Sequence, residues 1–278
     1  MELYFRICLK GCQALENKTH KPKYPVQSLE KALEVIELLK ESPGEGLRIN
    51  DLSERLGLGK STVHRILDTL LAYQFVEKSP HSRYRLSWKL FEIGNTVPRQ
   101  RSLDYFDPKP LQDLCNKHGE TVNLAIRVRD RAVIISKYDP QNVTVKASLL
   151  VGEQEPLHST AIGKALISEL SRDELSSTLG EGPLEKCTQN TIDSVDQLHE
   201  HLASVRENGY AVDEEEYSAG LTCIGVPIKN HREEIIAAIS ISGPTFRLQH
   251  NKIINIIGDL KETRDLISEY FGLYQAAL

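Results

Sequence analysis

The sequence has no long apolar run. No stretch of its 278 residues approaches the roughly 18 consecutive apolar residues that a membrane-spanning helix needs. Charged residues make up 26% of the chain and hydrophobic residues 40%, which is typical of a folded globular protein. We therefore expect no membrane partner and room for two domains, each with its own core.

The first 24 residues also lack the pattern of a secretory signal. One acidic and one basic residue precede only a short apolar patch, and LKGCQAL has no small-x-small cleavage site. We expect residues 1–24 to be a loosely ordered leader of a cytoplasmic protein.

Cysteine is scarce and follows no framework spacing. The five cysteines, an odd number, stand at positions 8, 12, 115, 187 and 223, which favours a reducing compartment. Cys8 and Cys12 could pair or bind a metal, but zinc sites ordinarily need four such ligands, or three and a water. No second Cys/His pair is close to them in the sequence, so we expect no metal and no other cofactor.

The chain has no overall excess of positive charge. Its formal net charge of -5 by itself argues against binding to nucleic acid. From residue 55 to residue 89, however, only Asp68 and Glu77 are acidic. Seven basic residues stand in the same segment: Arg55, Lys60, Arg65, Lys78, Arg83, Arg85 and Lys89. A basic segment on an acidic chain predicts one specialised electrostatic surface.

Within this segment GLGKST, residues 57–62, looks like part of a phosphate-binding loop. Such a loop needs a strand before it and a glycine five residues ahead of Gly59. That position holds Glu54, whose carboxylate would repel a phosphate, and the preceding INDLSERL has helical spacing. The sequence therefore argues against a nucleotide site here.

The same segment has the layout of a winged helix-turn-helix. Hydrophobic spacing predicts a helix over 27–40, with Ser28 as cap and an apolar face of Leu29, Leu33, Ile36 and Leu38. A second helix is predicted from the cap Asn50 to residue 56. A turn at 57–59 leads to a third helix from Lys60. FVEK and RYRL then alternate like the strands of a hairpin around SPHS.

In such a motif the second helix of the pair presents its first residues to base edges, and the hairpin is the wing. The sequence thus predicts contacts with double-stranded operator DNA. The expected contact residues are Lys60, Ser61, Thr62, His64 and Arg65 in the helix, and His81 and Arg83 in the wing. The alternative is a plain three-helix packing module with a solvated charged face.

The second half of the chain mixes strands and helices. Residues 86–105 combine helical spacing, a proline and basic residues, as a linker does. Beyond them we expect helices over 108–118, 157–170, 194–209 and 249–270. The expected strands cover 121–128, 132–139, 143–149, 209–213, 222–228 and 234–242. Antiparallel strands flanked by helices indicate an α+β domain.

Three segments, PLHSTAIGKAL, DEEEYSAGLTCIGVPI and ISISGP, predict a ligand pocket. The amides of Thr160, Ala161 and Ile162 start a helix, where the dipole favours a small anion. Ser240 and Ser242 alternate along a strand, so both hydroxyls project to one face. Leu149, Leu221 and Ile239 supply apolar walls, and an apolar site with a few polar groups is typical of a small-molecule pocket.

Several of these segments resemble a known family. KALEVIELL, LSERLGLGKSTVHRILDTL, FVEKSPHSRYRL and KLFEIG resemble, in order and spacing, the N-terminal domain of IclR-type bacterial transcription regulators. The family often has Pro where Gly59 stands and Gly where Gln74 stands. The pocket segments resemble the effector domain of the same family, so the resemblance covers about residues 25–272.

The resemblance implies an α+β architecture. It places a winged helix-turn-helix domain at 25–88, a linker helix at 89–106 and a GAF-like effector-binding domain at 107–278. It also implies a ligand-responsive transcription regulator whose effector is a small organic acid. We expect a repressor, with activation as the alternative that the sequence leaves open. We expect a homodimer or homotetramer, because one reading head buries too little surface for selective binding to DNA.

The effector residues follow from the matched positions and the apolar wall. They are Ala161, Ile162, Asp213, Leu221, Cys223, Ser240 and Ser242. The family often has small residues where Ile162 stands, so this pocket is expected to be narrower or more apolar. The simpler alternatives are a buried inert thiol at Cys223, a solvated turn at Asp213, and serines that bond only to backbone.

Two further alternatives use the same residues. A hydrolytic enzyme with an autoregulatory DNA-binding domain would employ Cys223 or Ser159 with His158, but nothing in the sequence orders a third member of a triad. A reactive thiolate needs a nearby cation, and Cys223 has no basic neighbour in sequence. Asp213, Cys223 and His158 could instead hold zinc. We expect no catalytic residue and no enzymatic activity.

Overall fold

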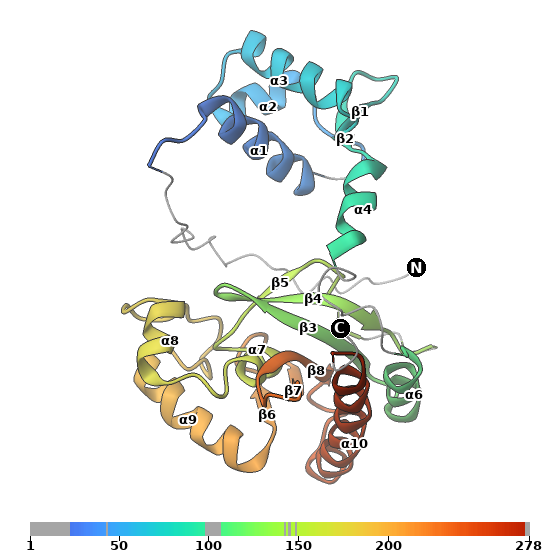
Figure 1. Ribbon diagram of the computed structural model, residues 1–278, viewed down its shortest axis with the longest axis vertical. Helices are drawn as coiled ribbons and strands as arrows, with labels where there is room; N and C mark the ends of the chain where they lie inside the picture. Colours follow the sequence, from blue (N-terminus) through green and yellow to red (C-terminus); the bar gives the residue numbers. More distant parts are fainter. Residues whose placement is uncertain are drawn as a thin grey trace. The chain divides into compact units, whose positions relative to one another are not determined.

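The computed structural model describes residues 23–42, 44–97, 107–141, 143, 146–147 and 149–275 (Figure 1). The chain divides into two compact units, one with the described residues up to 97 and the other with those from 107 onward. Most of the expected leader, with Cys8 and Cys12, and the second half of the expected linker lie outside the described residues. None of the described helices is both long and apolar enough to cross a membrane.

The first unit is a helix-turn-helix followed by a hairpin. Its elements are α1 (Gln27–Lys40), α2 (Ile49–Leu56), α3 (Lys60–Ala72), β1 (Val76–Lys78), β2 (Tyr84–Leu86) and α4 (Trp88–Gly94). β1 and β2 pair antiparallel, and Leu47 adds a bridge to Tyr84. Val35, Leu52 and Leu67 bring the three helices together in one core. The winged helix-turn-helix prediction is therefore confirmed.

Backbone conformation explains the turn between α2 and α3. Gly57 ends α2 in the left-handed region at φ 62°, which glycine adopts without a steric penalty. Gly59 then starts α3 with φ -61° and ψ 140°. The residues ahead of GLGKST form helix α2 rather than a strand, so the rejection of a phosphate-binding loop is confirmed.

The helix starts differ from the expected ones. Val26, not Ser28, is the cap position of α1, and no side chain caps it. α2 begins two residues earlier than expected, with Arg48 at the cap position rather than Asn50. The Asp51 carboxylate accepts the Arg48 backbone N–H at 2.9 Å. Tertiary packing, rather than the preference of Ser and Asn for cap positions, determines where these two helices start.

The expected apolar face of α1 is only partly the buried one. Ile36 and Leu38 pack against the core, but Leu29 and Leu33 are 57% and 53% exposed. Val35 and Leu39 are the buried residues of this helix. Apolar residues cover more than one face of this helix, so spacing alone could not decide which one packs. Leu29 and Leu33 are left as apolar surface.

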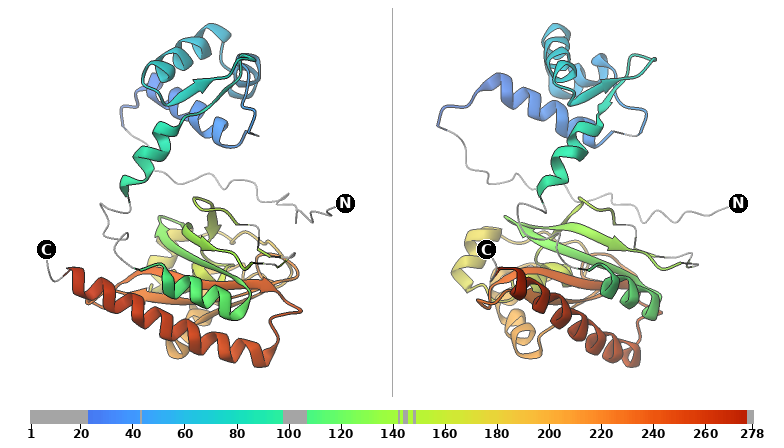
Figure 2. Two further views of the ribbon diagram at one scale, coloured as in Figure 1. Left: turned by 90° about the vertical axis from the view of Figure 1, so that its right-hand side faces the viewer. Right: turned by 45° about the vertical axis from the view of Figure 1, so that its right-hand side comes forward.

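The second unit is a six-stranded antiparallel sheet with helices. Its elements are α6 (Lys109–His118), β3 (Thr121–Val128), β4 (Arg131–Tyr138), β5 (Gln154–Pro156), α7 (Ala161–Leu166), α8 (Arg172–Leu179), α9 (Val195–Asn208), β6 (Ala211–Glu214), β7 (Leu221–Lys229), β8 (Ile235–Pro244) and α10 (His250–Gln275). The strand order is β5-β4-β3-β8-β7-β6. Within this unit, α8 and α9 lie to one side and α6 and α10 to the other (Figures 1 and 2). The α+β prediction is confirmed.

Two predicted details of this unit are wrong. The described residues among 143–149 form no strand, and β5 at residues 154–156 is the sheet's edge instead. The prediction also omitted α8, although Ser171 and Glu174 form the reciprocal capping box that starts it. β5 has only three residues, too few for a periodic pattern.

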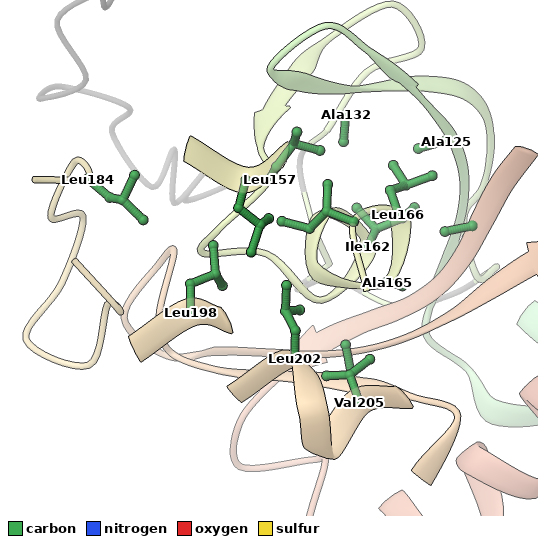
Figure 3. Close-up of a cluster of buried hydrophobic side chains, with 14 of the residues drawn as sticks. Ala125, Ala132, Leu157, Ile162, Ala165, Leu166, Leu184, Leu198, Leu202 and Val205 are labelled. Atoms are coloured by element: carbon green, nitrogen blue, oxygen red, sulfur yellow. The ribbon is translucent and has the colours of Figure 1, made fainter. Parts of the chain in front are cut away.

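The core of the second unit surrounds α7, as Figure 3 shows. Ile162, Ala165 and Leu166 of this short helix pack with Leu198 and Leu202 of α9. Small residues of the sheet face this cluster, namely Ala125, Ala132 and Ala238.

Gly225 on β7 lets the start of α7 approach the sheet. A Cβ at this position would lie 2.7 Å from the carbonyl oxygen of Ala161, which is closer than real Cβ contacts. The absent side chain therefore lets the first residues of α7 lie against the sheet.

Candidate functional site

The first candidate surface is the N-terminal half of α3. Lys60, Ser61, His64 and Arg65 are exposed there and Thr62 is half-buried, whereas the apolar residues of α3 point into the core. Helical spacing therefore separates a basic, polar face from a buried face in one element. The structure brings all five expected helix residues onto this first half of α3.

The two residues expected to contact DNA from the hairpin, His81 and Arg83, differ in exposure. His81 is exposed in the turn between the strands. The Arg83 guanidinium instead donates to the Gly46 carbonyl at 2.9 Å and lies 3.8 Å from the Glu45 carboxylate. Arg83 is thus half-buried and holds the hairpin to the loop before α2, while one of its edges stays accessible.

A groove of about 670 Å³ runs along the same helix. Thr62 and Arg65 line it from α3, and Gln27, Ser28 and Lys31 line it from the start of α1. No pattern in the sequence predicts that these two segments meet. The packing of α1 on α3 brings Lys31 close to the predicted contact residues.

The second candidate site is a cavity in the sheet unit. All seven residues expected from the sequence line it, together with Leu149, which was expected as an apolar wall. The complete lining is Leu149, Glu155, Thr160, Ala161, Ile162, Asp213, Tyr217, Leu221, Cys223, Ser240 and Ser242. Its volume of about 10 Å³ holds about one water molecule. A larger occupant therefore requires the walls to move apart.

Strand register explains why these residues meet. Asp213 pairs with Cys223, and Cys223 pairs with Ser242, so the three stand in one row across β6, β7 and β8. Cross-strand partners point to the same face of a sheet. In the adjacent row Gly225 pairs with Ser240, and the start of α7 covers this glycine.

The α7 start contributes backbone groups to the cavity. The Thr160 hydroxyl accepts the Gly163 N–H at 3.1 Å and donates to the Pro156 carbonyl at 2.7 Å. The amides of Ala161 and Ile162 come before the first intrahelical hydrogen bond of α7, so the helix itself gives them no partner.

The cavity also holds two carboxyl groups. Oδ1 of Asp213 accepts the backbone N–H groups of Glu216 at 2.7 Å and Tyr217 at 3.3 Å, whereas its Oδ2 is buried without a partner in the described part of the chain. Burial raises the pKa of Asp213 to about 7. Burial, with the charge of Asp213, raises the pKa of Glu155 to about 8.

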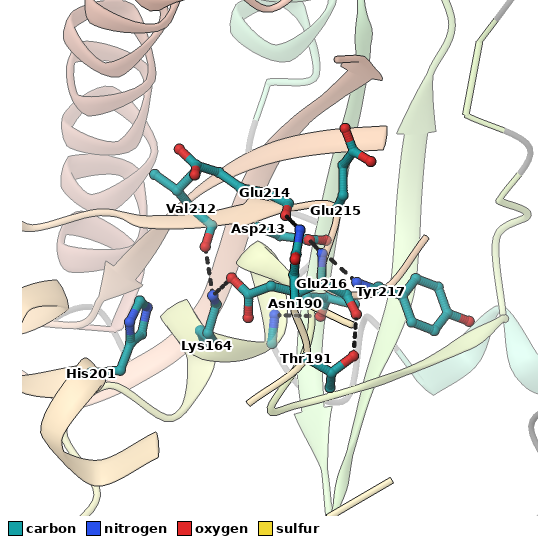
Figure 4. A network of polar contacts seen from close by, with 12 residues as sticks. Lys164, Asn190, Thr191, His201, Val212, Asp213, Glu214, Glu215, Glu216 and Tyr217 are labelled. Atoms are coloured by element: carbon teal, nitrogen blue, oxygen red, sulfur yellow. Dashed lines mark hydrogen bonds and ion pairs between the residues drawn. The ribbon is translucent and has the colours of Figure 1, made fainter. Parts of the chain in front are cut away.

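Behind the cavity a buried ion pair joins two walls, as Figure 4 shows. The Lys164 ammonium on α7 donates to the Glu216 carboxylate and to the Val212 carbonyl. Thr191 donates to the Glu216 carbonyl at 2.6 Å, so the loop after β6 is held from two sides. Burial, with the Lys164 charge, lowers the pKa of His201 to about 4, so this ring is neutral at neutral pH.

The described residues are not arranged as the hydrolytic-enzyme and zinc alternatives require. The His158 Nε2 lies 2.8 Å from the Glu185 carbonyl, and the Ser159 Oγ contacts the Cys187 Sγ at 3.9 Å, so His158 and Ser159 bond to different partners. Burial raises the pKa of Cys223 well above its usual value, which keeps the thiol protonated. In the described segments no group of three His, Cys, Asp or Glu side chains could hold a metal.

Three residues at or behind the cavity were not predicted from the sequence. Glu155 lies on a strand too short to recognise, and Tyr217 lies in a loop whose path only the fold decides. Lys164 is fully buried, and nothing in the sequence distinguishes it from a solvent-exposed lysine on a helix. Its partner Glu216 belongs to the acidic run that was interpreted as including a solvated turn.

A helix-turn-helix unit and a second unit with a cavity, in one polypeptide, are typical of transcriptional regulators that carry both a DNA-binding and a ligand-binding domain. The comparisons agree with this class. Residues 28–80 match the IclR helix-turn-helix domain, and residues 105–269 match the C-terminal domain of the bacterial transcriptional regulator IclR.

Named relatives match over nearly the whole chain. XynR, an HTH-type transcriptional regulator of Escherichia coli, is 34% identical over 248 residues, which cover 89% of this chain and 98% of XynR. The DNA-binding transcriptional repressor YiaJ of the same organism is 32% identical, with 88% of each chain covered. The crystal structure of Thermotoga maritima IclR superposes with a TM-score of 0.72 at 30% identity, covering 88% of this chain and 99% of that one.

The chain therefore belongs to the IclR family of bacterial transcriptional regulators. These relatives are described as regulators or repressors and not as enzymes, which agrees with the expectation of no enzymatic activity.

Proposed function

We propose that the protein is a repressor that binds operator DNA through α3 and the β1–β2 hairpin. The exposed polar and basic residues at the start of α3 support this proposal, because that end of a recognition helix meets base edges in the major groove. The name of YiaJ describes a repressor, which supports the direction of regulation. His81 in the hairpin turn and the accessible edge of Arg83 are proposed to contact the DNA backbone.

The DNA-binding proposal is tested by Arg65→Ala. If this guanidinium makes a bidentate base contact, the change weakens specific binding by roughly 1 to 3 kcal/mol. Arg83→Ala weakens specific and non-specific binding alike and lowers the salt slope by about one. Arg232→Ala, an exposed arginine of the second unit, is the matched control. Unchanged affinity in both folded test variants would contradict the proposal.

We further propose that the cavity of the second unit binds a small organic acid as effector. The observation that carries this proposal is that all seven residues expected from the sequence line one cavity. The hydroxyls of Ser240 and Ser242 and the amides at the start of α7 are donors suited to a carboxylate. Because the cavity holds about one water, binding must widen it. We propose that this change alters DNA affinity through the linker.

Linkage provides the test of this regulatory role. If the effector changes operator affinity, operator DNA changes effector affinity by the same factor. Ser242→Ala removes one donor and weakens binding of the acid by about 1 to 3 kcal/mol, whereas the exposed Ser177→Ala leaves it unchanged. Calorimetric titration of small carboxylates with and without operator measures both effects. Equal affinity in the two titrations would exclude the regulatory role.

The remaining expectations are part of the same proposal. We propose a homodimer or homotetramer in the cytoplasm, with domain limits at 25–88, 89–106 and 107–278. Paired heads on a palindromic site bury the surface that one head lacks. α4 supports the predicted linker helix over its first residues, and the similarity of the second domain to GAF domains stays a prediction.

A further inference from the structure

Glu155 is a carboxyl group of the cavity to which the proposed function gives no role. It lies on β5 opposite Ala132, it is only 5% exposed, and its side chain lines the cavity. Burial and the negative charges of Asp213 and Glu153 all raise its pKa. Burial of an ionised carboxyl is costly, so this position requires an explanation.

Asp213 faces the same cavity from β6. Its Oδ1 is occupied by two backbone N–H groups, and its Oδ2 is buried and unpartnered within the part of the chain described. The residue is 1% exposed. Two nearly inaccessible carboxyl groups therefore line a space that has room for about one water molecule.

Among the described residues around this pair, each cation already has a carboxylate close to it. The charges of Glu153 before β5, Glu216 and Lys164 on α7 act on the pair, Cys223 on β7 pairs with Asp213, and Arg131 on β4 pairs with Pro156, next to Glu155. Of the two cations, Lys164 bonds to Glu216 and Arg131 lies 3.8 Å from Asp130. Two ionised carboxylates would repel each other here, and desolvation disfavours both.

We propose that Glu155 and Asp213 form a carboxylic-acid pair that is protonated in the closed cavity and donates its two O–H hydrogens to the carboxylate of the effector. This inference rests on the organic-acid effector of the proposed function and makes Glu155 a specificity-determining residue. A protonated carboxyl is a donor, so the pair selects a carboxylate over an amine. Hydrogen bonds to an ionised acceptor are about twice as strong as neutral ones.

Proton uptake follows from this arrangement. The pKa values of about 7 for Asp213 and about 8 for Glu155 mean that the free pair loses protons as pH rises through this range. The bound carboxylate adds negative charge and keeps both protons in place. Above about pH 7 the complex therefore takes protons from solvent, and carboxylate affinity falls by up to tenfold per pH unit for each proton taken up.

Infrared spectroscopy of the full-length protein tests the pair without any ligand. A protonated carboxyl has a C=O stretch that is separate from carboxylate and amide bands. We expect such bands at about pH 6, their decrease toward about pH 9, and the loss of one band in each of Glu155→Gln and Asp213→Asn. Glu207→Gln, an exposed carboxyl of α9, is the control and leaves the bands unchanged. Ionised carboxyls at about pH 6 would overturn the proposal.

Acetate and methylammonium, of similar size and opposite charge, are the probes for selectivity. We expect acetate to bind more tightly at about pH 6 than at about pH 9, and Glu155→Gln to reduce this difference, because the amide is a donor at both pH values. Equal acetate affinity at both pH values, or tighter binding of methylammonium that Glu155→Gln abolishes, would overturn the inference. If the infrared bands are present but acetate binds at neither pH, the organic-acid effector is contradicted while the protonated pair stands.

Discussion

At the scale of single residues, two positions differ from the family's usual choice, and their backbone angles show what each choice does. Gly59 has φ -61° and ψ 140°, a conformation that proline also adopts. Gln74 has φ 61°, in the left-handed region that favours glycine. The family preference for Pro and Gly at these two positions thus agrees with the backbone of this chain.

Gly59→Pro should stabilise the protein. The substitution restricts the unfolded chain, and it fits the folded backbone because no atom other than the Ser61 hydroxyl oxygen, at 4.0 Å, lies near an added Cβ. We expect the free energy of unfolding to rise by about 0.4 to 1 kcal/mol. Urea denaturation of the Gly59→Pro single variant measures this difference in the free energy of unfolding. Gly57→Pro is the contrasting control and destabilises, since φ there is 62°. A destabilised Gly59→Pro variant would show that the turn does not tolerate the ring.

Glu155 makes stability depend on pH. Its pKa is about 8 in the folded protein and near its usual value of 4.5 when unfolded. Between these values the folded state holds a proton that the unfolded state has released. The contribution to stability is therefore complete below about pH 4.5 and is lost as pH rises toward about 8, at up to about 1.4 kcal/mol per pH unit.

Glu155→Gln should remove this dependence. The free energy of unfolding, measured by urea denaturation at several pH values between about 5 and 8, is expected to fall less steeply in the variant than in the unaltered protein. His201, whose pKa is lowered, acts in the opposite direction and is common to both proteins, so the difference between them reports Glu155 together with its coupling to Asp213. Parallel curves would mean that Glu155 is ionised in the folded state.

At the scale of elements, α7 connects the two walls of the cavity. Its first residues line the cavity, and Lys164, one turn later, is bound to Glu216 in the loop after β6. The side chain of Lys164 is 0% exposed and that of Glu216 is 10% exposed. Removing one member of such a pair leaves an uncompensated buried charge.

Lys164→Met should therefore be strongly destabilising. We expect a loss of about 3 to 5 kcal/mol in the free energy of unfolding, and a partial recovery when Glu216→Gln is added. Lys186→Met is the matched control, because its pair with Asp193 is exposed and is worth at most about 1 kcal/mol. A small loss in Lys164→Met, or no recovery in the double variant, would mean that the two groups are not coupled.

At the scale of the whole molecule, apolar side chains of the first unit are left on the surface. Leu29 and Leu33 of α1 and Trp88 and Phe91 of α4 are each more than half exposed. The two aromatic rings stack edge to face with their centroids 5.9 Å apart. Apolar residues that a single unit leaves uncovered are suited to an interface between copies of the chain. We therefore expect the proposed homodimer or homotetramer to assemble through the N-terminal unit and the linker helix.

Trp88→Ala should weaken this assembly. Exposed tryptophans at interface centres commonly contribute about 2 kcal/mol or more, so we expect the dimer dissociation constant to rise at least about tenfold. Light scattering across micromolar concentrations measures the mass. Phe246→Ala, an exposed aromatic of the second unit, is the control and keeps the unaltered mass. If the unaltered protein is a monomer that still binds a two-half-site operator tightly, the proposal is wrong.

The sequence by itself determined the class of fold and most of the elements. Periodicity predicted α1 at residues 27–40, and it also predicted α3, β3 and β4 and the long C-terminal helix, because each is long enough for its apolar spacing to show the type of element. The turn after α2 was readable because Gly57 is in the left-handed backbone conformation that glycine adopts without penalty. Seven cavity residues were also named from the sequence, through the resemblance and the alternation of Ser240 and Ser242.

Only the tertiary structure decided what short segments and buried charges do. β5 has three residues, too few to show a period, so Glu155 could not be placed in the cavity. Lys164 and Glu216 are 52 residues apart and meet only because α7 packs on the end of β6. Charge in a sequence is ordinarily a sign of solvent exposure, and whether a carboxyl is buried, paired or protonated depends on neighbours that folding brings from other strands.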